Sequence, residues 1–88
     1  MNKPLTDADT RLKRLRYRSW HRGCKETDLI LGQFADKKLA GLAPEMLAIY
    51  ERLLDENDAD IWKWVVGNIA PAEYAELLTQ LRYLVHGA

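Results

Sequence analysis

The stretch PAEYAELLTQLRYLV, which spans residues 71–85, carries the strongest structural signal in the chain. Its apolar residues recur at the i, i+3, i+4 and i+7 spacing of a helix that packs one face against a core. Pro71 is expected to open this helix, because proline suits a first helical position, where its missing N–H costs no hydrogen bond. The apolar face comprises Tyr74, Leu77, Leu78, Leu81, Leu84 and Val85.

A second clear helix is predicted upstream, from Pro44 to about Leu54. Pro44 again fits a first helical position, and Glu45 and Glu51 are expected to face solvent. The apolar stripe of this helix comprises Leu47, Tyr50, Leu53 and Leu54. The two helices therefore present apolar faces that can pack together.

Between these helices the sequence predicts a polar turn and then a short helix. Asp58 or Asp60 can cap its amino end, and Gly67 suits a left-handed residue at its carboxyl end. Trp62 and Trp64 lie two positions apart and cannot share one helix face. We expect Trp62 to be buried and Trp64 to be partly exposed, because Trp62 matches the apolar row of Ile61, Val65 and Val66.

The amino-terminal half predicts two further helices, which Gly23 separates. The first begins near Thr6, with Asp9 at the N3 position of a capping box, and its inner row comprises Leu12, Leu15 and Ser19. The second covers roughly Glu26 to Lys38. Its apolar face comprises Leu29, Ile30, Leu31 and Phe34, and Gly32 indicates a close crossing of two helices.

These patterns predict an all-α protein, a compact single-domain bundle of five short helices over residues 1–88, since no strand pattern occurs in the sequence. A chain of 88 residues with 48% hydrophobic composition can form one core. It leaves little room for a deep pocket, which favours a binding module over an enzyme. We expect a monomer.

Charge is distributed unevenly, although the net charge is zero. Residues 1–26 hold eight basic and three acidic residues, and the remainder holds five basic and ten acidic residues. Such a polar molecule suits oriented docking to a partner. Alternatively, the two parts neutralise each other within the fold. The basic first helix also allows nucleic-acid binding through Tyr17 and Trp20, which the acidic remainder disfavours.

Other functional classes find little support in the sequence. His21 and Cys24 could form half of a zinc site, but only His86 is available as a further histidine. We therefore expect no metal, and we expect no catalytic role for Cys24, because no group orients His21. No apolar run is long enough to span a membrane. We interpret the run from Arg11 to Arg18 as part of the fold, and we expect a cytoplasmic protein.

One motif points to a specific family. The segment Arg22-Gly23-Cys24-Lys25-Glu26, followed by Asp28, is similar to the R-G-x-x-E signature of the succinate dehydrogenase flavinylation factors. The resemblance extends from Arg16 to Leu84 and includes the second helix, Pro71 and the stretch Arg52-Leu53-Leu54, Asp60-Ile61-Trp62 and Trp64. Cys24 and Thr27 depart from it, since many relatives carry apolar residues there.

The resemblance implies a five-helix assembly factor that is not an enzyme. Such a factor binds the flavoprotein subunit of succinate dehydrogenase and promotes the covalent attachment of FAD to that client. It binds no cofactor stably itself. The resemblance adds the fumarate reductase flavoprotein as a second client. The implied partner-binding residues are Arg18, His21, Arg22, Gly23, Glu26 and Asp28.

The chemistry of these residues fits docking. Gly23 leaves the backbone bare for a close approach, and the Arg22 guanidinium can bind a carboxylate or backbone carbonyls. Without the resemblance, we would expect an internal ion pair between Arg22 and Glu26, four residues apart on a helix. Two other functions stay open: an antitoxin-like regulator that binds another protein, and a small nucleic-acid-binding domain.

Overall fold

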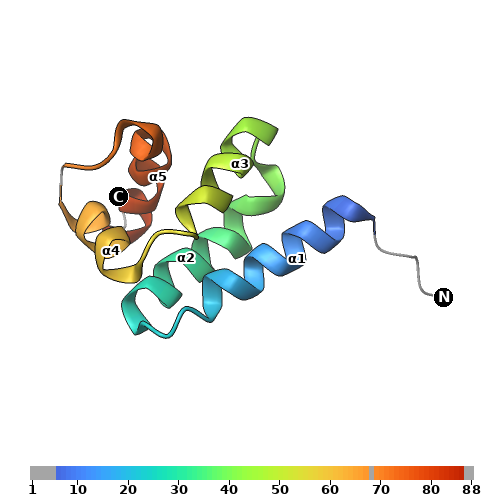
Figure 1. Cartoon of the computed structure of the whole chain (residues 1–88), viewed down its shortest axis with the longest axis horizontal. Helices are drawn as coiled ribbons and strands as arrows, with labels where there is room; N and C mark the ends of the chain where they lie inside the picture. The colour runs from blue at the N-terminus through green and yellow to red at the C-terminus, as the bar shows by residue number, and fades with distance from the viewer. Residues whose placement is uncertain (1–5, 68, 87–88) are drawn as a thin grey trace.

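The computed structural model describes residues 6–67 and 69–86, without the side chain of His86. Figure 1 shows a bundle of helices joined by short connections. Within these ranges there is no strand, which confirms the predicted all-α fold. The helices are α1 (Asp7–Trp20), α2 (Lys25–Lys38), α3 (Pro44–Leu53), α4 (Asp58–Val66) and α5 (Ala75–His86), with 3₁₀ turns η1 (Leu39–Gly41) and η2 (Ala72–Tyr74).

Local sequence signals place several helix starts. The Thr6 side chain accepts a hydrogen bond from the Asp9 N–H at 3.0 Å, and the Asp9 carboxylate accepts one from the Thr6 N–H at 3.3 Å. This reciprocal pair is the predicted capping box of α1. Pro44 opens α3 as expected. Pro71 caps η2, which leads directly into α5.

Both predicted ends of α4 were wrong in detail. Asn57 caps the helix, and its side-chain oxygen accepts a hydrogen bond from the Asp60 N–H at 2.9 Å, whereas Asp58 and Asp60 lie in the first turn. An acidic first turn suits the helix dipole without being the cap. Gly67 is extended, with φ −99° and ψ −172°, and is not left-handed. The chain therefore leaves α4 without the turn that the glycine indicated.

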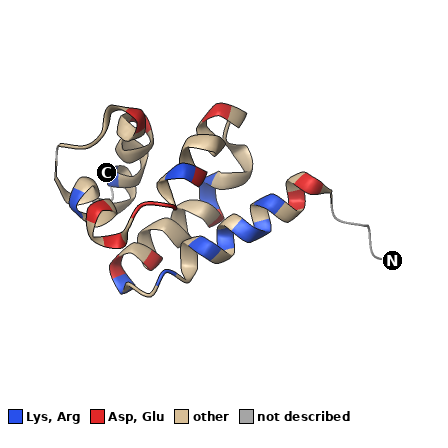
Figure 2. Ribbon diagram, viewed as in Figure 1, with Lys and Arg blue, Asp and Glu red and all other residues tan. Residues whose placement is uncertain are grey.

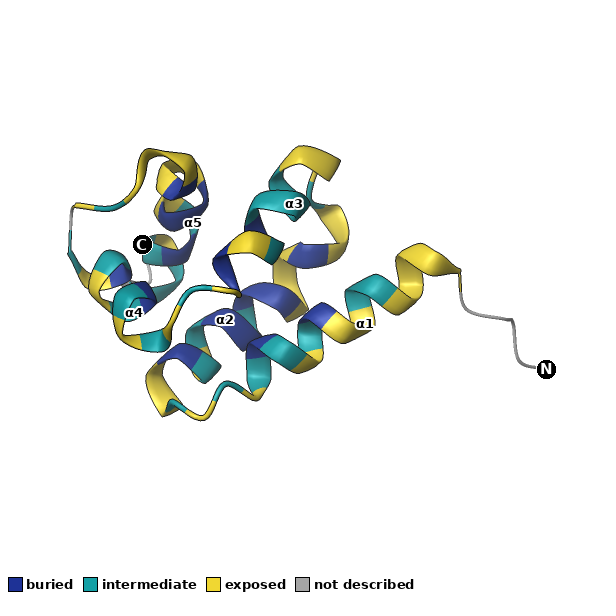
Figure 3. Ribbon diagram, viewed as in Figure 1, coloured by how far each residue is buried: buried dark blue, intermediate teal, exposed yellow. Residues whose placement is uncertain are grey.

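The core is formed by residues of all five helices, as Figure 3 shows in dark blue. The stripe predicted on α5 supplies most of it, since Leu77, Leu78 and Leu81 are fully buried. From α3, the core takes Tyr50 and Leu53, as predicted. Phe34, Leu31 and Ala35 of α2, Ile61 and Val65 of α4, Leu15 of α1, and Leu39, Leu54 and Tyr74 complete the cluster.

The inner faces of α2 and α4 differ from the predicted ones. Leu29, expected in the core, is 51% exposed, and Thr27 is buried instead. On α4, Trp64 packs against the core and its ring stacks on Tyr74 at a centroid distance of 5.7 Å. Trp62 does not belong to this cluster. Trp64 is partly exposed, as predicted, although it packs against the core, whereas the predicted burial of Trp62 was wrong, since Trp62 is only half-buried and lies outside the cluster.

Helix α1 is attached to α2 through a tryptophan and a glycine. A Cβ atom placed on Gly32 would overlap the indole of Trp20, so α2 can hold no other residue there without displacing α1. This contact confirms the close crossing that the sequence predicted at Gly32. Figure 1 shows α1 crossing α2 near the connection between them, while its amino-terminal end extends away from the other helices.

A buried polar network joins α1, α2 and α3. The hydroxyls of Ser19 and Tyr50 lie 2.6 Å apart, the Ser19 hydroxyl donates to the Leu15 carbonyl, and the Tyr50 hydroxyl lies 3.1 Å from the Leu31 carbonyl. Burial raises the pKa of the Tyr50 hydroxyl well above its usual range. The network links α1 and α2, which flank the loop at Gly23, to α3. No helix among the described residues is long and apolar enough to cross a membrane.

Candidate partner-binding site

The loop between α1 and α2 carries the motif and has a specific backbone geometry. Gly23 adopts φ +90°, a conformation that other residues rarely adopt, and it lies on the surface. A Cβ atom built on it would meet no atom within 4 Å. The Arg22 N–H donates to the Asp28 carboxylate at 2.7 Å, which ties the loop to the first turn of α2. The sequence correctly placed a helix break at Gly23.

The Arg22 side chain points into the molecule. Its side chain is only 11% exposed, and its guanidinium donates three hydrogen bonds to the connection between α3 and α4 and to the first residue of α4. Nε bonds the Asp58 carboxylate at 2.5 Å, Nη1 the Leu54 carbonyl at 2.7 Å and Nη2 the Glu56 carbonyl at 2.5 Å. We call this arrangement the Arg22 clamp. It uses the planar fork of donors that the sequence indicated, but the acceptors belong to the same chain.

Neighbouring side chains complete the clamp. The Thr27 hydroxyl donates to the same Asp58 oxygen at 3.1 Å, so one carboxylate joins the loop, α2 and α4. The Glu56 side chain accepts from the Tyr74 hydroxyl at 2.8 Å. Burial, and then this hydrogen bond, raise the pKa of Tyr74 well above its usual range. The internal pair of Arg22 is thus with Asp58 and not with Glu26.

The six predicted partner-binding residues fall into two groups. Arg18 pairs with Asp55 at 2.8 Å, and Arg22 and Asp28 hold the loop as described. His21 and Glu26 are exposed, as is Gly23. His21 stacks on Tyr17 with ring centroids 4.2 Å apart. The structure therefore gives Arg18, Arg22 and Asp28 internal contacts, and leaves His21, Gly23 and Glu26 accessible.

Part of the charge asymmetry of the sequence is neutralised within the fold, since three of the eight basic residues in residues 1–26 pair with later acidic residues. Figure 2 shows the basic residues of α1 and of the following loop in blue and the acidic residues of the later segments in red. Arg11 pairs with Glu51 at 2.7 Å, and Arg18 and Arg22 pair with Asp55 and Asp58. Glu51, expected to face solvent, is half-buried against Arg11. These ion pairs are of the kind expected if residues 1–26 and the remainder of the chain neutralise each other within the fold.

The Cys24 thiol lies 3.4 Å from a Glu26 carboxylate oxygen. Among the side chains that the structure describes, no group of three or more His, Cys, Asp or Glu residues is arranged to hold a metal ion. The His86 side chain, considered with His21 and Cys24 in the sequence, lies outside the described residues.

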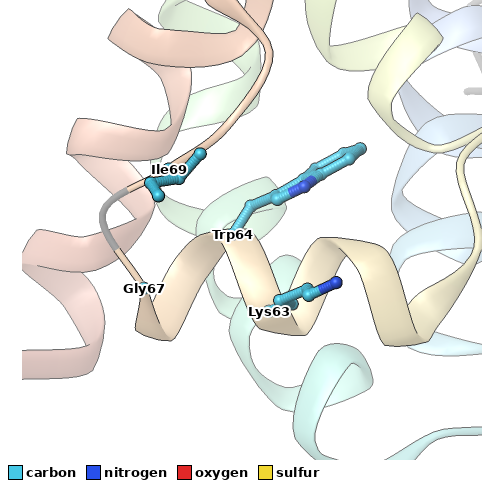
Figure 4. A pocket seen from close by; sticks show the side chains of 4 residues that line it. All are labelled: Lys63, Trp64, Gly67 and Ile69. Carbon is cyan, nitrogen blue, oxygen red and sulfur yellow. The ribbon is translucent and has the colours of Figure 1, made fainter.

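Two surface hollows lie on the α4 side of the molecule. One, of about 450 Å³, is lined by Lys63, Trp64, Gly67 and Ile69, and Figure 4 shows Trp64 and Lys63 extending from α4 with Ile69 on the chain that follows it. The other, of about 270 Å³, lies among α2, α4 and α5, and we call it the α2 groove. It contains Glu26, and so adjoins the motif.

Sequence reasoning missed the α2 groove, although a signal for it was present. Glu26, Leu29, Ile30 and Gln33 are spaced i, i+3, i+4 and i+7, which places them in one row on α2. A second row, with Thr27, Leu31, Phe34 and Ala35, is the buried one. The two rows share a helix, and the predicted apolar face mixed them.

These features define a small helical protein with a rigidly held, exposed loop as its most distinctive surface. Residues 13–85 match the family model described as "Flavinator of succinate dehydrogenase". The chain belongs to this family, which confirms the resemblance inferred from the motif.

The relatives named in the comparison are assembly factors. The chain is 48% identical over 67 residues to "Succinate dehydrogenase assembly factor 2, mitochondrial" of Aspergillus terreus, covering 76% of this chain and 22% of the relative. The protein of the same name from Debaryomyces hansenii is 45% identical over 60 residues, covering 68% and 42%. "Succinate dehydrogenase assembly factor 2-B, mitochondrial" of Drosophila mojavensis is 38% identical over 90 residues, covering 98% and 57%.

The expected cytoplasmic location is contradicted, because each of these relatives is named mitochondrial. The Arg-rich run does lie in a helix of the fold, from Arg11 to Arg18 within α1. A position within the fold does not indicate the cellular compartment of a protein, so the Arg-rich run gave no support to a cytoplasmic location. The chain spans between about a fifth and three-fifths of the length of these relatives.

Proposed function

We propose that this protein binds the flavoprotein subunit of succinate dehydrogenase and promotes covalent attachment of FAD to that subunit. It acts without catalytic residues of its own and without holding FAD stably. Its family membership supports the assembly role, and the loop at Gly23 supports the docking role. The fumarate reductase flavoprotein is a second client under the same proposal.

The observation that carries the proposal is the combination of a bare backbone and a rigid support. Gly23 is exposed at φ +90° with open space around its Cβ position. The Arg22 clamp behind it and the Asp28 carboxylate beside it hold this backbone in place. A partner can therefore approach the main chain closely without a loss of loop entropy on binding.

The proposed mechanism is positioning. Flavin attachment is the chemistry of the client and its FAD, and a docked partner holds the client in the geometry that reacts. The exposed Glu26 carboxylate and the Gly23 backbone are the contacts we assign to the client. Arg22 acts through the loop, as a positioning residue.

The nucleic-acid alternative loses support from the ion pairs. Three of the basic residues that motivated it, Arg11, Arg18 and Arg22, are paired with acidic side chains of the same chain. Their charge is then less available for phosphates.

Two substitutions of Gly23 test the docking role. Gly23→Ala adds backbone strain and one methyl group, and Gly23→Arg adds the same strain plus a long charged side chain on the surface. Because a Cβ atom has open space at this position, each variant should lose about 1 kcal/mol of stability from the positive φ and remain folded. Flavinylation of the client should be reduced with Gly23→Ala, whose methyl group stands on the approached backbone, and abolished with Gly23→Arg.

The measurement uses purified flavoprotein subunit with FAD and each variant, followed by in-gel flavin fluorescence, beside thermal unfolding of each variant. Omission of the protein gives the unassisted level. Flavinylation at the wild-type level with a folded Gly23→Arg would show that the client does not approach Gly23. Absence of any increase with the wild-type protein would refute the proposed function as a whole.

A further inference from the structure

The α2 groove continues the motif surface along α2. Its α2 wall is the row Glu26, Leu29, Ile30 and Gln33, and its other wall comes from Trp62 of α4 with Leu84 and Val85 of α5. Glu26 therefore belongs both to the motif and to the groove. A partner that contacts the motif at Glu26 is already at the end of this groove.

The groove is apolar and leaves large side chains in contact with water. Leu29 is 51% exposed, and Trp62 is half-buried and lies outside the core cluster. Leucine and tryptophan on two different helices gain free energy when a partner covers them together. Tryptophan is also enriched among the residues that dominate binding energies at interfaces.

Among the side chains that the structure describes, the groove has a single charged lining residue, and that residue is acidic. The only contact recorded for the Glu26 carboxylate within residues 6–67 and 69–86 is the Cys24 thiol, and none of the three ion pairs in those ranges includes Glu26. A cationic group of a partner is the chemistry that complements it.

This charge argues against a second copy of the chain as the occupant. A twofold self-association places the same patch opposite itself. It would bring two Glu26 carboxylates to an apolar interface where no cation is found among the described lining residues. Like charges in such an interface oppose association, so the occupant must be a different surface.

We infer that the α2 groove receives a segment of the client flavoprotein that inserts an apolar side chain between Leu29 and Trp62 and places a lysine or arginine against Glu26. The inference rests on the proposed function, because it assigns the occupant to the same client. It extends the docking surface from the loop to the carboxyl half of α5, and it predicts the chemical character of the client segment.

The test compares two equally exposed aliphatic residues. Leu29 lines the groove and Val66, on α4, does not, and their exposed fractions are 51% and 52%. Leu29→Gln should weaken binding to purified client flavoprotein by about tenfold or more, as loss of a central interface anchor does. Val66→Gln should change the dissociation constant by less than about twofold. Isothermal titration calorimetry measures both.

Folding is checked by thermal unfolding of each variant. Leu29→Ala, which keeps a strong helix former, serves as the second variant should Leu29→Gln lose stability, and is expected to weaken binding in the same direction. If wild-type protein binds the client and both Leu29 variants bind equally well, the groove inference is wrong while the proposed function stands. If wild-type protein does not bind the client, both are wrong.

The charge is tested separately through salt dependence. Binding of the wild-type protein should weaken as ionic strength rises, and Glu26→Gln should reduce that dependence, since screening acts on the ion pair. Glu26→Lys should bind more weakly than Glu26→Gln. Unchanged salt dependence in Glu26→Gln would overturn the assignment of a cationic residue. A photo-cross-linking residue at position 29 should capture a client peptide that contains lysine or arginine, and a peptide without either would also overturn it.

Discussion

Arg22 and Glu26 lie four residues apart in one motif, yet their surroundings are opposite. The Arg22 side chain is 11% exposed, and its guanidinium donates three hydrogen bonds within the molecule. The Glu26 side chain is on the surface, with the Cys24 thiol as its recorded contact. A single signature thus contains a residue that holds the fold and a residue that is open to a partner.

The difference teaches how a small protein presents a binding surface. A loop with a left-handed glycine is costly to keep in one conformation unless other contacts determine it. Here the Arg22 clamp and the Asp28 carboxylate supply those contacts from the inner side. The outer side is then free to carry exposed polar and apolar groups, from His21 to Leu29. Stability and binding should therefore respond to different substitutions within the same segment.

Arg22→Ala should give the largest loss of stability. The substitution removes the guanidinium from the Asp58 carboxylate, which keeps only the Thr27 hydroxyl, and leaves the carbonyls of Leu54 and Glu56 without this donor. Removing one partner of such a pair costs about 3 kcal/mol. Chemical denaturation followed by circular dichroism measures the shift in midpoint.

Arg22→Lys is the matched control, because lysine keeps the charge but not the planar fork of donors. It should restore only part of the lost stability. If Arg22→Ala unfolds at the wild-type midpoint and loses only client binding, the guanidinium serves the partner and the division between the two residues fails.

The two tryptophans of α4 extend the comparison to a second helix. Trp64 packs on the core and stacks on Tyr74, and Trp62 lines the α2 groove. Trp64→Ala should cost about 2–3 kcal/mol of stability, and Trp62→Ala about 1 kcal/mol. Client affinity should follow the reverse order, with the larger loss for Trp62→Ala. Equal stability losses for the two variants would contradict this assignment of faces.

Most of the fold could be predicted from local signals. The stripes of α3 and α5, the capping box at Thr6 and the break at Gly23 all depend on residues close in sequence. Helical period alone then determines which of these residues face the core. Gly32 also belongs here, since a glycine inside a helix indicates that another element comes close.

The rest depended on contacts distant in sequence. The acceptors of Arg22 lie 32 to 36 residues further along the chain, so no local pattern could distinguish an internal clamp from a partner contact. On α2 and α4 the apolar residues exceed what one face can hold. Which of Leu29 or Leu31, and of Trp62 or Trp64, is buried depends on how α2, α4 and α5 pack together.

Alkaline pH should lower the stability of the contacts that support the loop from within, the Arg22 clamp and the neighbouring hydrogen bond of Tyr74. Tyr74 has a pKa raised by burial and by its bond to Glu56, whose carbonyl belongs to the Arg22 clamp. A raised folded-state pKa gives stability that is complete below the ordinary tyrosine pKa of about 10 and is lost as pH rises through the folded value. The free energy of unfolding should therefore fall above about pH 10.

Tyr74→Phe tests the source of this dependence. It should cost about 1 kcal/mol at neutral pH, through the lost hydrogen bond, and make the alkaline decline shallower. A decline remains, since the buried Tyr50 also has a raised pKa. Urea unfolding at pH 7 and at pH 10.5 measures both effects, and an unchanged slope in Tyr74→Phe would remove Tyr74 from the explanation.

Cys24 lies between Arg22 and Glu26 in the motif. Its substitution by serine should have the smallest effect on stability, and it should raise stability instead of lowering it. It is the N-cap residue of α2, with an extended backbone, and its side chain accepts no capping hydrogen bond from a backbone N–H of the first turn. Serine is among the preferred residues at this position, because its hydroxyl accepts from a free backbone N–H. Cys24→Ser should therefore raise stability by about 0.5 kcal/mol and leave client flavinylation unchanged. Within the part of the chain that the structure describes, the thiol's one hydrogen bond is its weak contact with Glu26 at 3.4 Å. Thermal unfolding and in-gel flavin fluorescence of the client measure the two outcomes.

A loss of flavinylation in a stable Cys24→Ser variant would give the thiol a chemical role, and would place the functional centre of the motif between Arg22 and Glu26 instead of on its outer side.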